Sequence, residues 1–128
     1  KLYTTTAATD GKQTFPSMRD CYLYHRPYMY THSKGEVCVK SLQNFLNRLR
    51  AVDRTSWEWL SVDGIYGTAT MRATNGFNCK YTTPYDAFCY YPDFNSNSWA
   101  AARRRCEQHH YWQDAGLWDA CGGDSNWY

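Results

Sequence analysis

Apolar positions follow their clearest pattern between residues 36 and 51, where hydrophobic side chains recur every three or four residues. Positions with this spacing share one face of an α-helix. That face comprises Val39, Leu42, Phe45, Leu46 and Leu49. Most polar residues of the stretch fall on the other face: Gln43, Asn47, Arg48 and Arg50. The pattern predicts an amphipathic helix over residues 36–51 that ends near Asp53.

A second helix is predicted to begin at Thr68, directly after a turn. Ala69, Ala73 and Phe77 lie at i, i+4 and i+8, so they form one face of mostly small residues that can pack closely. Gly76 favours a helix end near that position, because glycine is common just past the last turn of a helix. We therefore expect a short second helix.

A third helix is predicted over residues 98–110, because one face there carries Trp99, Ala102 and Cys106. Residues 1–30 show no lasting periodicity and are expected to form an irregular arm laid over the core. Residues 111–128 are expected to form a tail. The sequence thus predicts a single domain, residues 1–128, whose mainly α core spans residues 31–110.

The turn between the first two helices contains Asp63 and Gly64. Gly64 can adopt the positive φ that a tight turn often requires, and the Asp63 carboxylate is expected to accept local N–H bonds. Gly67 is expected to let the chain turn sharply into the second helix. Thr68 and Thr70, in its first turn, are interpreted as capping residues before they are interpreted as ligands.

The chain contains six cysteines, and neither a Cys-x-x-Cys pair nor a histidine at zinc-ligand spacing accompanies them: Cys21, Cys38, Cys79, Cys89, Cys106 and Cys121. An even number spread over the chain predicts three disulfides formed in an oxidising compartment. Six cysteines allow 15 pairings, and the sequence does not choose among them. No charged-then-apolar leader follows Lys1, so we expect a mature, secreted, extracellular chain.

Aromatic residues dominate the hydrophobic composition, with 12 tyrosines, 6 tryptophans and 5 phenylalanines. They must fill much of the interior, yet so many tyrosines cannot all be buried, and exposed rings are suitable platforms for the apolar faces of sugars. A formal net charge of +2 provides no strong field for nucleic acid. No apolar run approaches the roughly 20 residues of a membrane span. We expect a monomer that binds neither nucleic acid nor membrane.

One nine-residue stretch, following the first predicted helix and opening the second, carries a family resemblance: Val62-Asp63-Gly64-Ile65-Tyr66-Gly67-Thr68-Ala69-Thr70. It resembles the first half of the peptidoglycan-binding domain attached to many cell-wall hydrolases. Residues 91–101 echo this stretch, with an aspartate, a hydrophobic residue and small polar residues before a helix. This second copy departs from the Asp-Gly-hydrophobic-x-Gly pattern between residues 92 and 98. The resemblance covers roughly residues 30–110.

The resemblance implies a small three-helix bundle, here with irregular N- and C-terminal arms tethered by disulfides. It also implies non-covalent attachment to bacterial peptidoglycan or a related amino-sugar polymer, with no cofactor. In that family the ligand lies in a shallow groove near the turn-plus-helix units. Rings would stack on sugar, and Arg72 or amide groups would bond the stem peptide. The residues implied as ligand-binding are Tyr66, Arg72, Tyr91, Asn95 and Trp99, although Trp99 also lies at an apolar helix position that favours the core.

Two other function classes stay open. A small muramidase or stem-peptide hydrolase would need paired carboxylates. Glu58 is the acid to consider, since Trp57 and Trp59 flank it, but the sequence indicates no partner, and two packed rings around a solvated acid are the simpler interpretation. A secreted inhibitor or toxin that binds a protein is favoured by the aromatic segment at residues 22–30.

The remaining charged and titratable residues indicate no further site. The histidines lack metal-site spacing, and no metal is expected: His25, His32, His109 and His110. Arg103, Arg104 and Arg105 span about 200° of a helix, so they form no flat patch. Cations near a helix C-terminus are favoured by the helix dipole, and at least one arginine is expected at the edge of the core with its stem buried.

Overall fold

The regular structure of the protein is helical. The computed structural model describes residues 15–33, 37–83, 89–108, 115–123 and 126–127. These residues contain no β-strand, only an isolated bridge between Met29 and Phe94. Their five helices are α1 (Met18–Tyr24), α2 (Val37–Asp53), α3 (Thr68–Tyr81), α4 (Ser96–Glu107) and α5 (Ala115–Cys121). The expectation of a mainly α fold is confirmed.

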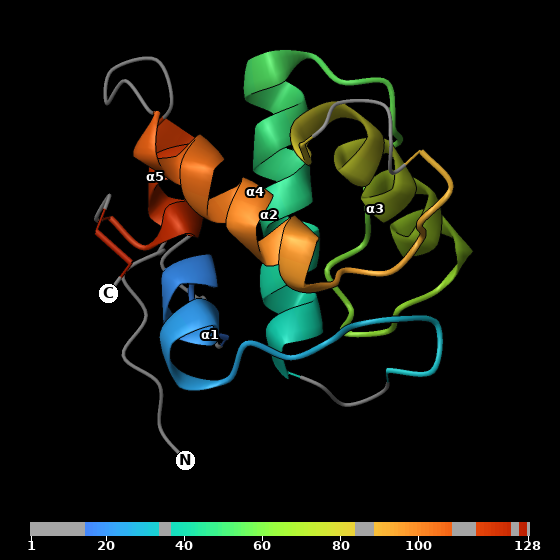
Figure 1. Cartoon of the computed structure of the whole chain (residues 1–128), viewed down its shortest axis with the longest axis horizontal. Helices are drawn as coiled ribbons and strands as arrows, with labels where there is room; N and C mark the ends of the chain where they lie inside the picture. The colour runs from blue at the N-terminus through green and yellow to red at the C-terminus, as the bar shows by residue number, and fades with distance from the viewer. Residues whose placement is uncertain (1–14, 34–36, 84–88, 109–114, 124–125, 128) are drawn as a thin grey trace.

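Helix α2 lies at the centre of the molecule. Helices α1, α3 and α5 all pack against it, while α4 packs against α3 and α5 (Figure 1). Part of the polar face predicted for α2 is buried along with the apolar one, because Gln43 and Asn47 are only 1% and 3% exposed. The prediction placed these amides away from the core, and this was wrong. They are buried because they bond the backbone of the α2–α3 connection.

The N-terminal arm is not irregular throughout, because α1 lies within it. Ser17 caps this helix by accepting a hydrogen bond from the backbone N–H of Asp20 at 3.1 Å. Met18 and Cys21 are fully buried, and α1 packs against both α2 and α5. A seven-residue helix is too short to be stable alone, so these tertiary contacts stabilise it. Residues 1–14 of the expected arm lie outside the described residues.

The C-terminal tail likewise contains a helix, α5. Leu117 and Cys121 are fully buried, and Trp127, near the end of the chain, packs against Tyr22 at a ring-centroid distance of 5.3 Å. Both termini therefore contribute to the core. The part of the chain that the structure describes has five helices, where three helices with irregular arms were expected.

Helix α3 extends past Gly76 to Tyr81, so the predicted early end was wrong. A Cβ atom at Gly76 would lie 3.0 Å from Cε3 of Trp57. The indole of Trp57 donates to the carbonyl of Leu46 at 3.1 Å, which fixes the ring against both helices. Gly76 therefore gives a neighbouring ring room in mid-helix and does not mark a helix end.

Helix α4 begins at Ser96, two residues earlier than predicted. Asn95 caps it: its side-chain oxygen accepts from the backbone N–H groups of Asn97 at 2.9 Å and Ser98 at 3.2 Å. The Ser98 hydroxyl in turn accepts from the backbone N–H of Asn95 at 3.1 Å, completing a capping box. The predicted C-terminal end at His110 lies outside the described residues.

Three disulfides are present, as the cysteine count predicted. They join Cys21 to Cys38, Cys79 to Cys89 and Cys106 to Cys121. The first ties α1 to α2, and the last ties α4 to α5. No helix among the described residues is both long and apolar enough to cross a bilayer.

Aromatic rings fill the centre of the core, as the composition predicted. The Phe77 ring lies 5.8 Å from Phe45, 5.0 Å from Tyr81 and 5.8 Å from Phe94, centroid to centroid. Phe94 in turn meets Trp99 edge-on at 4.8 Å. This stack joins α2, α3 and α4, and it fixes the N-terminal end of α4, beside which the candidate site lies.

Candidate functional site: an aromatic cleft at the start of helix α4

Two turns precede α3 and α4, and an amide side chain from the preceding helix holds each of them. Gln43 of α2 accepts from the backbone N–H groups of Asp63 and Gly64 at 3.1 and 3.0 Å. Its Nε2 donates to the carbonyl of Ile65 and to Oγ1 of Thr70, both at 3.0 Å. The first turn is thus fixed to the central helix by one residue.

The predictions for the first turn hold at Asp63, Gly64 and Gly67, and the predicted cap at Thr70 was wrong. Gly64 has the expected positive φ of 78°. The Asp63 carboxylate accepts from the backbone N–H of Ile65 at 2.9 Å, and this bond lowers the pKa of Asp63. Gly67 is the N-cap of α3, so the chain enters the helix at this position as expected, with an ordinary extended backbone. Thr70 is buried as the partner of Gln43 and caps nothing.

Asn78 of α3 holds the second turn in the same way. Its Nδ2 donates to the carbonyls of Tyr91 and Asp93, both at 2.8 Å. Its side-chain oxygen accepts from the hydroxyl of Ser98 at 2.5 Å. The departure from the Asp-Gly pattern in residues 92–98 therefore does not loosen this turn.

A segment from the N-terminal arm runs alongside the second turn. The backbone N–H of Met29 donates to the carbonyl of Phe94 at 3.1 Å, and the backbone N–H of Phe94 donates to the carbonyl of Met29 at 2.8 Å. This pairing places residues 25–33 along one end of the bundle, next to the start of α4 (Figure 1). Two segments far apart in sequence thus meet at one surface.

A cleft of about 330 Å³ lies where these segments meet. Arg26, Pro27 and Tyr28 contribute from one side, and Asn95, Ser96 and Trp99 contribute from the first turn of α4. Arg26 carries the only formal charge among these six residues. The cleft therefore combines two aromatic rings, hydrogen-bonding groups and one cation.

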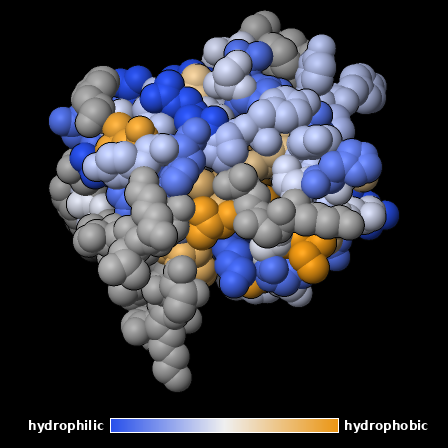
Figure 2. All heavy atoms as spheres, turned by 90° about the horizontal axis from the view of Figure 1, so that it is seen from below, coloured by the Kyte–Doolittle hydropathy of each residue, from blue (hydrophilic) through white to orange (hydrophobic). Residues whose placement is uncertain are grey.

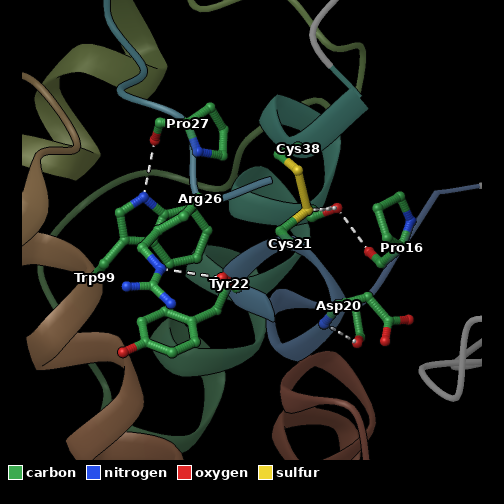
Figure 3. Close-up of a disulfide and its surroundings, with 10 residues drawn as sticks. Pro16, Asp20, Cys21, Tyr22, Arg26, Pro27, Cys38 and Trp99 are labelled. Carbon is green, nitrogen blue, oxygen red and sulfur yellow. Dashed lines mark hydrogen bonds between the residues drawn. A yellow bond between two sulfur atoms is a disulfide. The ribbon is translucent and has the colours of Figure 1, made fainter. Parts of the chain in front are cut away.

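Trp99 forms the inner part of the cleft. Its side chain is 2% exposed, and its indole N–H donates to the carbonyl of Pro27 at 2.8 Å (Figure 3). This bond attaches the 25–33 segment to α4. Trp99 is therefore primarily a core residue that also borders the cleft.

Arg26 is anchored at its inner end. Its Nε donates to the carbonyl of Tyr22 at 3.0 Å, and its guanidinium carbon lies 3.9 Å from the centre of the Tyr22 ring (Figure 3). Its backbone is left-handed, with a φ of 47°, because the residue ends α1 by donating its N–H to the carbonyl of Cys21. The charge of Arg26 is thus held in place beside the cleft.

Tyr28 is the exposed ring of the cleft, at 56% exposure. Its hydroxyl donates to the carboxylate of Asp93, which raises the pKa of that hydroxyl. The Tyr28 ring lies 5.5 Å from the ring of Tyr30, which in turn lies 5.5 Å from His32. An aromatic row therefore leads away from the cleft along the segment.

Figure 2 shows the molecule from below the view of Figure 1, the end on which residues 25–33 run. Strongly hydrophobic residues form only small, separate patches on the described part of this face. The exposed large hydrophobic residues within 25–33 are Tyr28 and Tyr30, and each has a polar hydroxyl at the edge of a flat ring. Such a face suits a polar ligand with flat apolar faces better than an aliphatic partner.

The structure brings together only some of the residues implied as ligand-binding. Asn95 and Trp99 line the cleft, and Tyr91 is half exposed on the turn that leads to it. Tyr66 is 1% exposed and its hydroxyl donates to the carbonyl of Pro92 at 2.5 Å. Its ring therefore cannot stack on a sugar, and that implied role was wrong. Arg72 is exposed on α3, where its Nη1 lies 3.8 Å from Oε1 of Glu58, and it does not line the cleft.

Four of the six cleft residues were missed as ligand candidates, including its exposed ring and its cation. Tyr28 belonged to the aromatic segment that favoured a protein-binding role, and its alternation with Tyr30 was the available signal. Arg26 had no signal in the sequence, since its proximity to Trp99 depends on how the chain returns from α1.

A second cavity, of about 310 Å³, lies where three helices end. There Arg105 forms a two-pronged ion pair with Asp53, with N–O distances of 3.0 and 2.9 Å. Arg104 donates to the carbonyl of Tyr81 at 3.2 Å. These cations thus bond groups at the C-terminal ends of α3 and α2, whereas the sequence predicted only that the dipole of their own helix favours cations there. This cavity is therefore explained by its structural role.

The candidate acid Glu58 and the two acids with raised pKa values lie outside the linings of the two cavities. Glu58 is exposed next to Arg72; Trp57 is buried as expected, but Trp59 is 54% exposed, so only one of the flanking rings packs on the core. Burial raises the pKa of Asp20 and Asp119, yet neither lines either cavity. No group of three or more His, Cys, Asp or Glu side chains among the described residues could hold a metal ion.

Comparison with known proteins returns no relative: no protein-family model, no curated protein and no solved structure matches this chain.

Proposed function

We propose that the protein attaches non-covalently to bacterial peptidoglycan or a related amino-sugar polymer, through the cleft at the start of α4. The observation that carries this proposal is the exposed Tyr28 ring next to the Asn95 amide in one cleft. A flat ring complements the apolar face of a pyranose, and an amide N–H suits the carbonyl of an N-acetyl group.

The hydrogen-bonding groups of the cleft are partly committed and partly available. The side-chain oxygen of Asn95 caps α4, which leaves its Nδ2 as the donor that faces a ligand. The Ser96 hydroxyl can donate or accept. The aromatic row beyond Tyr28 gives an extended polymer further rings to lie against. This arrangement favours a chain of sugars over a single small molecule.

We further propose that the chain is a remodelled member of the peptidoglycan-binding domain family and acts outside the cell. The use of Gln43 and Asn78, each holding the turn that opens the next helix, supports an internal repeat of the helix-turn unit. Three disulfides are compatible with an extracellular location.

The test is co-sedimentation with insoluble peptidoglycan, with cellulose as the inert polymer. The wild-type protein should pellet with peptidoglycan, and Tyr28→Ala should weaken binding roughly 10-fold because the stacking surface is lost. Tyr28→Phe keeps the ring and should retain binding. Tyr90→Ala removes a ring that is 93% exposed and outside the cleft, and it should leave binding unchanged. Equal pelleting with both polymers would refute the proposal.

Two measurements on the same samples separate the other function classes. Mass analysis of the supernatant should detect no released saccharides or peptides; such products would instead establish a hydrolase. If the protein does not bind the wall polymer but pulls down a defined protein partner, a protein-binding role would be established.

A further inference from the structure

The cleft carries a fixed positive charge that a neutral sugar polymer does not require. Arg26 is the only charged residue among the six that line it. Its Nε is already bonded to the carbonyl of Tyr22, and its guanidinium carbon lies 3.9 Å from the centre of the Tyr22 ring. The terminal nitrogens remain as the donors for a ligand, and their planar arrangement matches the two oxygens of a carboxylate.

Aromatic packing makes this charge more rigid than an ordinary surface arginine. The Tyr22 ring contacts the Arg26 guanidinium. The same ring packs against Trp99 and Trp127, at centroid distances of 6.1 and 5.3 Å. Arg103 also approaches the Tyr22 ring, at 5.9 Å, but its Nε pairs with Oε1 of Glu107 at 3.4 Å, so Arg26 remains the cation that faces the cleft. A preorganised guanidinium loses little conformational freedom when it binds an anion.

The backbone of Arg26 does not by itself indicate a site. Arg54, just after the end of α2, has the same left-handed conformation, with a φ of 54°, and it does not line the cleft. Two arginines thus share one backbone conformation and differ in their surroundings. The inference therefore rests on the place of the Arg26 side chain in the cleft and not on the backbone conformation of Arg26.

We propose that the cleft selects carboxylate-bearing saccharides over neutral ones, with Arg26 as the residue that binds the carboxylate. This inference rests on the proposed function, because it names the ligand class of the same cleft. Tyr28 would contact the sugar ring, Asn95 would donate to its N-acetyl group, and the Arg26 guanidinium would form the charged hydrogen bonds.

The test compares two soluble oligosaccharides of equal length by calorimetry. One is a neutral N-acetylglucosamine tetramer, and the other is a peptide-free tetramer in which alternate residues carry a lactyl carboxylate. The wild-type protein should bind the carboxylated tetramer roughly 10- to 100-fold more tightly, as expected for a charge-assisted pair. Raised salt should reduce that preference.

Arg26→Gly should abolish the preference and keep affinity for the neutral tetramer. Glycine tolerates the left-handed backbone, so the variant should fold, and its thermal midpoint checks this directly. Arg54→Gly is the matched control, since it makes the same backbone change outside the cleft and should preserve the preference. Equal affinity of the wild type for both tetramers would overturn this inference but leave the proposed function intact. Binding of neither would overturn both.

Discussion

Gln43 shows how one side chain can set the position of a whole turn. An amide both donates and accepts, so Gln43 bonds the N–H groups of Asp63 and Gly64 and the carbonyl of Ile65 at once. At 1% exposure, the Gln43 amide itself has no access to compensating water. A residue without this double capacity would leave several buried polar groups unpaired.

We predict that Gln43→Ala lowers the free energy of unfolding by about 2 to 4 kcal/mol, because buried donors and acceptors lose their partners. Urea unfolding followed by circular dichroism measures this. Gln108→Ala makes the same replacement at an exposed position and should change stability by about 0.5 kcal/mol or less.

A second variant isolates the donor. Gln43→Glu keeps the shape of the side chain but cannot donate to the carbonyl of Ile65 when ionised. It should therefore destabilise the protein at neutral pH at least as much as the alanine variant. Wild-type stability in Gln43→Glu would show that the hydrogen bonds donated by the Gln43 Nε2 contribute nothing.

At the scale of elements, the sequence predicted the three longest helices but not their full extent. Apolar periodicity predicts α2 because the pattern repeats over several turns of this helix. Helices α1 and α5 have seven residues each, too few for a periodic signal, and disulfides and neighbouring helices hold them. Gln43 and Asn47 were misplaced because hydropathy does not record which polar groups have a buried backbone to bond.

The site was harder to predict than the fold for a similar reason. Asn95 and Trp99 lie next to a recognisable helix start, so a family resemblance could indicate them. Arg26 and Tyr28 reach the cleft through the Met29–Phe94 bridge, a pairing between distant segments that no local pattern specifies. Tyr66 was misassigned because a tyrosine in a turn gives no sign of whether its ring faces inward.

Gly76 provides the test at this scale. Replacing a mid-helix glycine with alanine usually stabilises a helix by roughly 0.5 to 1 kcal/mol. Here the added Cβ would lie 3.0 Å from a Trp57 ring that its hydrogen bond to Leu46 holds in place. We predict that Gly76→Ala instead destabilises the protein, by about 1 to 2 kcal/mol.

A double-mutant cycle with Trp57→Phe attributes the effect to that contact. The smaller ring should accommodate the new methyl group, so Gly76→Ala should cost less in the Trp57→Phe background. Equal costs in both backgrounds, measured by urea unfolding, would contradict the assigned cause.

At the scale of the whole molecule, Asp53 joins three helix ends. It terminates α2, accepts from the hydroxyl of Tyr81 of α3 at 2.5 Å and pairs with Arg105 of α4. Burial alone would raise the pKa of Asp53, but the hydrogen bonds from Arg105 and Tyr81 outweigh it, and the pKa lies below its usual range. Its ionised form therefore favours the folded state.

A pH dependence with a definite sign follows. The contribution of Asp53 is complete above the unfolded-state pKa of about 3.9 and is lost as the pH falls through the lower folded-state value. Asp53→Asn should reduce stability by about 1 to 2 kcal/mol at pH 7, because the pair is only partly buried. Urea unfolding should show this difference shrinking below pH 4. A difference that stays constant down to pH 2 would contradict the role of the charge.

The disulfide pattern has a consequence for how the chain matures. The six cysteines pair in order along the chain: the first with the second, the third with the fourth and the fifth with the sixth. The separations within the pairs are 17, 10 and 15 residues. When such a chain is threaded N-terminus first into an oxidising compartment, every cysteine meets its correct partner before the following pair emerges. The order of emergence alone therefore favours the native bonds among the 15 possible pairings.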